Sequence, residues 1–191
     1  MKTLYFLAGC NGAGKTTAAY SLLPDLLDCR EFVNADEIAR GLSPFRPETV
    51  SIQAGRLMLA RLRELLAAGE SFALETTLAT RIYLPMVAAA RAEGYAVRLF
   101  FFWLNSPDLA VTRVAARVRE GGHNIPEPII RRRYAGGLRQ FFQVYRSAVS
   151  SWAFMDNSHG TARLLASGAS EEVNVVDDEI WQLLTDTYHD G

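Results

Sequence analysis

The sequence has few cysteines, no surplus of charge of either sign and no long apolar run, and each shortage excludes a class of protein. Its 191 residues include only two cysteines, Cys10 and Cys29, which favours a reducing compartment over a disulfide-stapled scaffold. Twenty Lys and Arg residues against 21 Asp and Glu residues leave a formal net charge of −1. The chain therefore has no overall attraction to nucleic acid or to an anionic membrane. No apolar run approaches the roughly 20 residues that span a bilayer.

The start of the chain resembles a lipoprotein signal only superficially. The apolar stretch before Cys10 has about six residues, which is shorter than the apolar core of a signal peptide. We therefore expect a cytoplasmic protein. A hydrophobic content of 49% and a charged content of 21% are ordinary for a globular protein, and the length predicts one domain over residues 1–191.

A complete phosphate-binding motif is present at residues 9–17. Gly-Cys-Asn-Gly-Ala-Gly-Lys-Thr-Thr matches G-x-x-x-x-G-K-[ST], between an apolar run typical of a strand (3–8) and a helical segment (17–23). In such a loop the backbone N–H groups bind a triphosphate, Lys15 reaches its β- and γ-phosphates, and the Thr16 hydroxyl binds Mg²⁺. The bland alternative is a glycine-rich turn with an exposed lysine. The predicted nucleotide-binding residues are Gly9, Asn11, Gly12, Ala13, Gly14, Lys15, Thr16 and Thr17.

Strand-like and helix-like segments alternate along the rest of the chain. The alternation predicts an α/β fold with a parallel sheet, right-handed crossovers and ligands at the carboxyl ends of the strands. The longest apolar run, 96–104, predicts a central buried strand. Gly136 and Gly137 interrupt a long helix at a cost of about 1 kcal/mol each, which predicts close packing or a bend. The other predicted strands are 31–34, 71–75, 152–155 and an edge strand at 163–166; the predicted helices are 35–40, 47–68, one ending at 93, 106–120, 126–150 and 177–189.

Two carboxylates are predicted at the same rim as the phosphate-binding loop. Asp36 follows the short strand 31–34, where a carboxylate can accept the proton of a hydroxyl during transfer of a γ-phosphoryl group; equally, it can cap the helix that begins there. Glu75 ends an apolar strand, so it either faces the cleft and binds substrate hydroxyls or Mg²⁺-bound water, or is paired. Arg81 is either an anion clamp or an ordinary solvated helix residue. Thr76, Thr77 and Thr80 add hydroxyl groups at the same rim. The further substrate-binding candidates are Thr76, Thr80 and Arg81.

An arginine-rich segment at about 113–139 stands out in a nearly neutral chain. Seven arginines face only two glutamates there, which leaves a local excess of +5, and they bracket a Gly-Gly-His-Asn hinge at 121–124. The segment is either a solvated charged face or a lid that closes over the triphosphate, because arginine suits bidentate phosphate contacts. His123 is a candidate lid contact, and a metal site there is not expected.

Six motifs in this order resemble the zeta-toxin-like group of P-loop kinases. They are the phosphate-binding loop, Phe-Val-Asn-Ala-Asp (32–36), Glu-Thr-Thr-Leu (75–78), the Arg-Val-x-x-Arg-Val-x-x-Gly-Gly-His-x-Ile-Pro region (113–126), Arg-Arg-Arg-Tyr (131–134) and Asp-Asn-Ser (156–158). The resemblance covers about positions 3–160. It departs from the family pattern at Cys10, where proline is more usual, and in the lid, which is that of shorter chromosomal relatives.

The resemblance implies a three-layer, nucleoside-kinase-type fold with about five parallel strands, helices on both faces and an arginine-rich helical lid. It implies ATP and Mg²⁺ as cofactors, Lys15 and Asp36 as catalytic residues with Asp36 as the base, and Glu75 as a contact to the acceptor sugar. Lid arginines, Arg117 and Arg132 among them, would contact phosphate. The implied acceptor is a small-molecule hydroxyl, in the toxin branch that of UDP-N-acetylglucosamine, and an antitoxin protein is a candidate partner.

Two rival functions remain beside a small-molecule kinase. A nucleotide switch or mechanical ATPase is disfavoured because the chain lacks an Asn-Lys-x-Asp motif and an apolar run that ends in adjacent Asp and Glu. An ATP-binding or ATPase module that acts through a protein partner, without kinase activity, stays open. A kinase that transfers the γ-phosphoryl group of ATP to a hydroxyl is the leading hypothesis.

Overall fold

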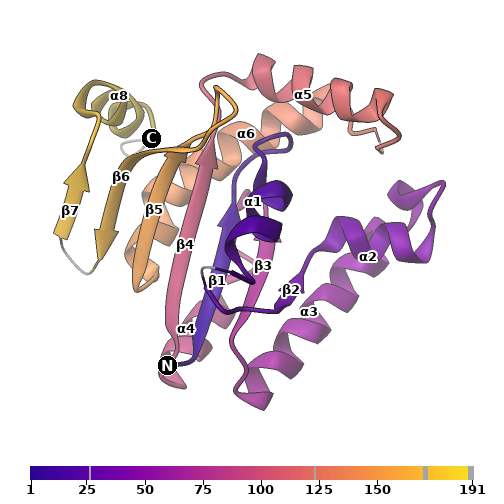
Figure 1. The fold of residues 1–191 in the computed structure, drawn as a ribbon, viewed down its shortest axis with the longest axis horizontal. Helices are drawn as coiled ribbons and strands as arrows, with labels where there is room; N and C mark the ends of the chain where they lie inside the picture. The colour runs from indigo at the N-terminus through magenta and orange to yellow at the C-terminus, as the bar shows by residue number, and fades with distance from the viewer. Residues whose placement is uncertain (26, 123, 170–171, 189–191) are drawn as a thin grey trace.

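The computed structural model describes residues 1–25, 27–122, 124–169 and 172–188. Within them the strands form a seven-stranded sheet in the order β2-β3-β1-β4-β5-β6-β7 (Figure 1). Strands β2 to β5 run parallel with β1, whereas β6 and β7 run antiparallel to their neighbours. The strands are β1 (Thr3–Ala8), β2 (Glu31–Val33), β3 (Phe72–Thr76), β4 (Ala96–Trp103), β5 (Ser151–Asp156), β6 (Arg163–Ala169) and β7 (Glu172–Val175).

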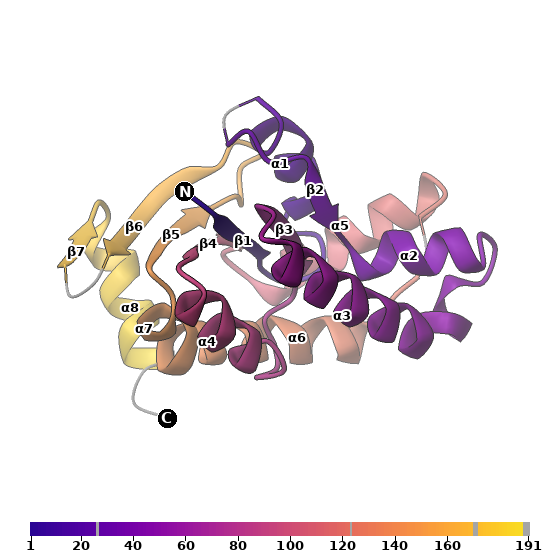
Figure 2. The ribbon, with the colours of Figure 1, turned by 90° about the horizontal axis from the view of Figure 1, so that it is seen from below.

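Helices lie on both faces of this sheet. Seen from below, α1 lies on one side of the strands, and α3, α4, α6 and α7 lie on the other (Figure 2). The pair α2 and α3 extends outward beyond the β2 edge (Figure 1). Over the described ranges, no helix has both the length and the apolarity to cross a membrane. The helices are α1 (Lys15–Leu22), α2 (Ala35–Leu42), the 3-10 helix η1 (Pro47–Val50), α3 (Ser51–Ala68), α4 (Leu84–Ala92), α5 (Pro107–Arg119), α6 (Glu127–Gln140), the π-helix η2 (Phe141–Tyr145), α7 (Arg146–Ala148) and α8 (Asp178–Tyr188).

The predicted α/β fold with a parallel sheet and helices on both faces is confirmed. The run predicted as the central strand is β4, which pairs with β1 and β5. The predicted five or so parallel strands are β1 to β5, and the sheet continues past them with the antiparallel strands β6 and β7. The predicted edge strand at 163–166 is β6, and the edge is β7, which the sequence analysis missed. Four largely exposed residues, Glu-Val-Asn-Val, give too short and too polar a pattern to be read as a strand.

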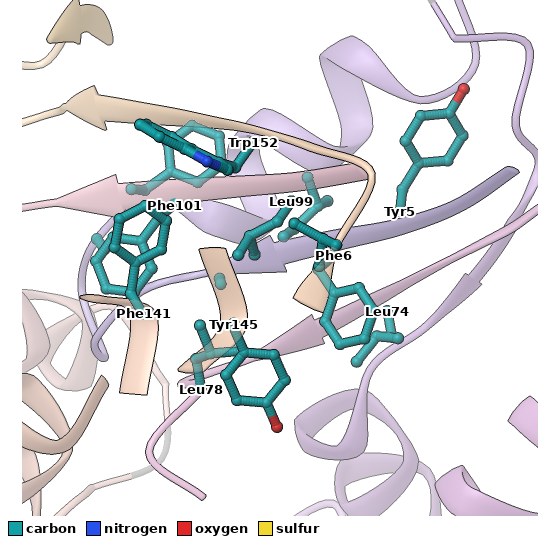
Figure 3. Packing of buried hydrophobic residues seen from close by; sticks show 14 of the residues in the cluster. Tyr5, Phe6, Leu74, Leu78, Leu99, Phe101, Phe141, Tyr145 and Trp152 are labelled. Atoms are coloured by element: carbon teal, nitrogen blue, oxygen red, sulfur yellow. The ribbon is translucent and has the colours of Figure 1, made fainter. Parts of the chain in front are cut away.

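The predicted helix 126–150 is divided into three parts, and its π-helical part anchors it to the core. Phe141 of η2 packs against Phe101 of β4 (Figure 3), with ring centroids 5.1 Å apart. It also packs against Phe154 of β5, with ring centroids 5.0 Å apart. On the same side, Trp152 of β5 stacks on Trp181 of α8 at 5.4 Å and 12°. Burial of one such ring stabilises the fold by roughly 1.5–3 kcal/mol. The π-helix thus places the Phe141 ring on the apolar face of β4 and β5.

Helix α6 approaches the backbone that follows β3 unusually closely. A Cβ atom at Gly137 would lie 2.5 Å from the carbonyl oxygen of Thr77, and one at Gly136 would lie 3.3 Å from the Cβ of Ala79. The predicted close packing of the glycine pair is therefore confirmed. It fixes the helix that carries three successive arginines over the carboxyl end of β3.

We expect Gly137→Ala to destabilise the protein by roughly 1–3 kcal/mol, because the added methyl group would overlap the Thr77 carbonyl. The matched control is Gly55→Ala in α3, where a Cβ meets no atom within 4 Å. That variant should gain up to about 1 kcal/mol from helix propensity. Urea unfolding of both variants checks the pair. Equal stability changes for the two would contradict the close approach.

Candidate functional site

The phosphate-binding loop packs closely against the end of β4 and against the residue that follows β5. Gly9, Gly12 and Gly14 have φ angles of +139°, +80° and +84°, which glycine adopts without strain. A Cβ at Gly9 would lie 2.2 Å from the Phe102 carbonyl oxygen, and one at Gly14 would lie 2.4 Å from the Asn157 side-chain nitrogen. Gly14 precedes α1, and no side chain caps that helix. Its first backbone N–H groups are therefore suited to bind an anion.

The loop after β5 braces the phosphate-binding loop. The Nδ2 of Asn157 donates to the carbonyl oxygen of Ala13 at 2.8 Å. Arg113 of α5 donates from Nη2 to the carbonyl oxygen of Ser158 at 2.9 Å and from Nη1 to that of Gly12 at 3.5 Å. These contacts give Asn157 and Arg113 a supporting role that the sequence analysis did not assign. The Asp-Asn-Ser motif was the available signal, although its function could not be read from spacing.

Glu75, at the end of β3, joins the two halves of the site. Its Oε2 accepts from the Thr16 hydroxyl at 2.7 Å and from the Nδ2 of Asn34 at 2.9 Å. Its Oε1 lies 3.5 Å from the Nζ of Lys15, which also donates to the Cys10 carbonyl oxygen at 2.9 Å. Both alternatives given for Glu75 from the sequence apply at once, since its carboxylate lines the cleft and is also paired.

One cavity of about 180 Å³ brings together Lys15 and Asp36, two of the predicted catalytic residues. Lys15, Asp36 and Glu75 all line it, and so do the predicted residues Asn11 and Thr76. Thr77, which the sequence also places at this rim, lines it as well. Further lining residues, to which the sequence analysis gave no role of their own in the cavity, are Asn34, Ala35, Met58, Tyr83 and Arg133.

Asp36 lies in the first turn of α2, and it is not the cap of that helix. The cap is Asn34, whose Oδ1 accepts from the backbone N–H of Asp36 at 2.8 Å. The alternative of Asp36 as a helix cap is therefore wrong. Both residue types cap helices well, and the end of β2 at Val33 decides which of them does so here. The Asp36 carboxylate belongs to the cavity wall.

Arg133 of α6 places a positive charge between the phosphate-binding loop and Asp36. Its Nη1 donates to the Oδ1 of Asn11 at 3.2 Å. Burial lowers the pKa of the Arg133 guanidinium, and the Asp36 carboxylate opposes that change; arginine nevertheless stays protonated. The sequence feature that could have identified Arg133 is its spacing, because it lies three residues after the buried Ile130 and four before the buried Gly137. This spacing places it on the inner face of the helix.

The predicted lid arginines lie elsewhere on α5 and α6. Arg132 is exposed and does not line the cavity. Arg117 is also absent from the lining. Its Nε and Nη2 are buried, with no hydrogen-bond partner in the described part of the chain. His123 lies outside the described residues.

The remaining predicted contacts lie away from the cavity. Thr80 and Arg81 are exposed. The Nε of Arg81 donates to the Oε1 of Gln140 at 3.0 Å, which ties the segment after β3 to the end of α6. Thr17 is exposed on α1.

The residues present suit a triphosphate with its Mg²⁺. Mg²⁺ binds through few protein ligands and keeps phosphate oxygens and waters as the others. Thr16 supplies one hydroxyl oxygen beside the Glu75 carboxylate. The described residues hold no group of three or more His, Cys, Asp or Glu side chains that could bind a metal ion alone. This donor set fits a metal ion that arrives with the nucleotide.

Cys10 sits inside the loop as an unreactive thiol. Burial raises the pKa of Cys10 from its ordinary value of 9.0 to about 11, against the opposing charges of Lys15 and Arg113. Because only the thiolate is nucleophilic, we expect iodoacetamide to alkylate Cys10 very slowly at pH 8, with a rate that rises up to about pH 11. Mass spectrometry of the native protein over this pH range, against the urea-unfolded protein, checks this. A rate that levels off by pH 9 would contradict it.

Comparisons with known proteins place the chain in a family. The family model described as AAA domain matches residues 4–136. An uncharacterised protein of Haemophilus influenzae is 30% identical over 129 residues, which cover 68% of this chain and 90% of that protein.

Two solved structures share the fold at low sequence identity. A chain of AvrRxo1-ORF1:-ORF2 with ATP has a TM-score of 0.75 at 19% identity, and the match covers 97% of this chain but only 64% of that chain, less than two thirds of its length. A chain of the PezAT chromosomal toxin-antitoxin system of Streptococcus pneumoniae has a TM-score of 0.67 at 16% identity, with 97% and 85% covered. With a matching model over more than half of its length, the chain belongs to the AAA domain family.

Proposed function

We propose that this protein is an ATP-dependent kinase that transfers the γ-phosphoryl group to a hydroxyl group of a small molecule. The observation that carries the proposal is the shared cavity, where Lys15 of the phosphate-binding loop and the carboxylate of Asp36 line the same space. Phosphoryl transfer needs a bound triphosphate beside a group that orients the attacking hydroxyl. A site that only holds a nucleotide does not need the second group.

The donor half of the site consists of the loop and the start of α1. Lys15, which bonds to the Cys10 carbonyl oxygen, would turn to the β- and γ-phosphates. The backbone N–H groups that follow Gly14 would bind the phosphate oxygens. Mg²⁺ held by Thr16 would neutralise charge on the β- and γ-phosphates.

The acceptor half is built from the first turn of α2 and from α6. Asp36 would accept the proton of the attacking hydroxyl, and Glu75 would contact a neighbouring hydroxyl or the water shell of the metal. Arg133 would stabilise negative charge on the transferred group. Arg117 and Arg132 would join them when the segment 113–139 closes over the nucleotide.

The resemblance to zeta-toxin-like kinases supports a nucleotide sugar as the acceptor, with UDP-N-acetylglucosamine as the first candidate. One of the two structural relatives is a chain of a toxin-antitoxin system, and the other is a chain of a two-component complex with ATP. They support ATP as the phosphoryl donor and an antitoxin protein as the partner of this chain.

We expect Asp36→Asn to lower acceptor-dependent turnover by about 10²- to 10⁴-fold, because a general base contributes on that scale. The affinity for ATP should change little, since Asp36 lies on the acceptor side. Glu37→Gln is the matched control, because Glu37 is the exposed neighbour of Asp36 in the same turn. ³¹P NMR and ADP release with UDP-N-acetylglucosamine and a panel of sugars and nucleosides measure the transfer.

One result would contradict the kinase, and another would contradict the role of Asp36. The first is ATP hydrolysis by the unaltered protein that no acceptor stimulates and Asp36→Asn leaves unchanged; this result would favour an ATPase module that acts through a partner. The second is equal acceptor-dependent turnover in Asp36→Asn and Glu37→Gln, which would show that Asp36 is not the general base.

We expect Arg133→Gln to lower turnover by about 10²-fold while ATP affinity changes only a few-fold, because a preorganised donor acts mainly on charge in the transition state. Arg139→Gln, an exposed position on the same helix, is the control. Arg117→Ala should also lower turnover more than ATP affinity. Steady-state kinetics with separate binding titrations check the three variants. A loss in ATP affinity as large as the loss in turnover would assign Arg133 to ground-state binding instead.

A further inference from the structure

The Asn34 side chain contacts both carboxylate-bearing segments of the cavity. It is 7% exposed and lies between the end of β2 and the start of α2. Its Oδ1 accepts from the Asp36 backbone N–H at 2.8 Å, and its Nδ2 donates to the Oε2 of Glu75 at 2.9 Å. Buried hydrogen bonds of this kind are costly to leave unmade.

These two bonds continue into the phosphate-binding loop. The same Oε2 of Glu75 accepts from the Thr16 hydroxyl at 2.7 Å. One chain of hydrogen bonds therefore runs from Thr16 through Glu75 and Asn34 to the backbone of Asp36. It connects the residue that would hold the metal to the turn that carries the proposed base.

Only an amide side chain can make both of these contacts. Asp and Ser cap helices as well as Asn does, because each accepts a hydrogen bond from the first turn. Neither residue can cap the helix and also donate a hydrogen bond to Glu75. Asp would place a second carboxylate beside that of Glu75, and Ser is too short to make both contacts. A residue needed as a cap alone would tolerate either replacement.

We propose that Asn34 is a positioning residue that couples the nucleotide half of the site to the acceptor half. Its amide holds the Glu75 carboxylate toward Thr16, and its oxygen fixes the turn from which Asp36 projects. The coupling rests on the proposed function for its catalytic meaning, but its effect on Mg²⁺-dependent nucleotide binding requires no acceptor.

The test compares Asn34→Ser and Asn34→Asp with Asn34→Ala. Asn34→Ser keeps the cap and loses only the contact to Glu75, so its melting temperature should lie above that of Asn34→Ala, which loses both; Asn34→Asp also keeps the cap, but it places a second carboxylate beside Glu75 and should melt lower than Asn34→Ser. All three should weaken Mg²⁺-dependent binding of adenylyl imidodiphosphate about tenfold. Binding of the same nucleotide in EDTA should be unchanged. Calorimetric titration measures the affinities.

Asp177→Ala is the control for the loss of a helix cap elsewhere. It removes the side chain that accepts from the Ile180 N–H at 3.2 Å, at the start of α8. This variant should be less stable while its Mg²⁺-dependent affinity is retained. If Asn34→Ser and Asn34→Asp bind the Mg²⁺ complex as tightly as the unaltered protein does, Asn34 is only a cap and the inference is wrong.

A double variant tests the contact between positions 34 and 75 directly. Glu75→Gln in the Asn34→Asp background reverses donor and acceptor, because the glutamine amide can donate to the new aspartate. The combined loss of affinity should be smaller than the product of the two single losses. Losses that multiply would overturn the coupling. Lack of transfer to every acceptor by the unaltered protein, with the coupling intact, would overturn the proposed function alone.

Discussion

The compensation of one buried negative charge organises the cavity. Glu75 follows three fully buried apolar residues, Phe72 to Leu74, and its side chain is only 10% exposed. A carboxylate so far removed from water is costly unless it is paired and hydrogen-bonded. Its partners are Lys15 and Thr16 of the phosphate-binding loop and Asn34 of the β2–α2 turn. Three segments distant in sequence are thereby held around one group, and the cavity lies between them.

Close backbone contacts at two glycines also position the phosphate-binding loop and α6 around the cavity. Gly9 lets the phosphate-binding loop press against the Phe102 carbonyl, and Gly137 lets α6 press against the Thr77 carbonyl. Because Arg133 lies one helical turn before Gly137 on the same face, the second contact delivers its guanidinium to the Asn11 side chain. The π-helical segment that follows keeps the helix on the sheet through Phe141. The position of the positive charge is thus a consequence of packing on β3 and β4.

Sequence could predict those parts of the site that depend on local patterns. The phosphate-binding loop, Asp36 and Glu75 follow from strand ends and a fixed spacing, and the cavity is lined by Asn11 and Lys15 of that loop together with Asp36 and Glu75. The choice of Asn34 over Asp36 as the cap depends on where β2 ends. The choice of Arg133 within a triplet of arginines depends on the rotation of α6, which Gly137 sets. Strand β7 escaped prediction because its register against β6, rather than its composition, makes it a strand.

The hydrogen bonds of the arginines around the cavity favour an anionic ligand in this region. Arg131 is paired with Glu127 and Asp108, Arg113 is bonded to the carbonyl oxygens of Gly12 and Ser158, and Arg81 is bonded to Gln140. Arg133 bonds to the neutral amide of Asn11, and two nitrogens of Arg117 are buried without a hydrogen-bond partner within the described ranges. Donors on partly desolvated cations are favoured when a ligand brings negative charge to them. The triphosphate that we propose to bind at Lys15 would bring such charge to the Arg133 side of the cavity, which Asp36 also lines.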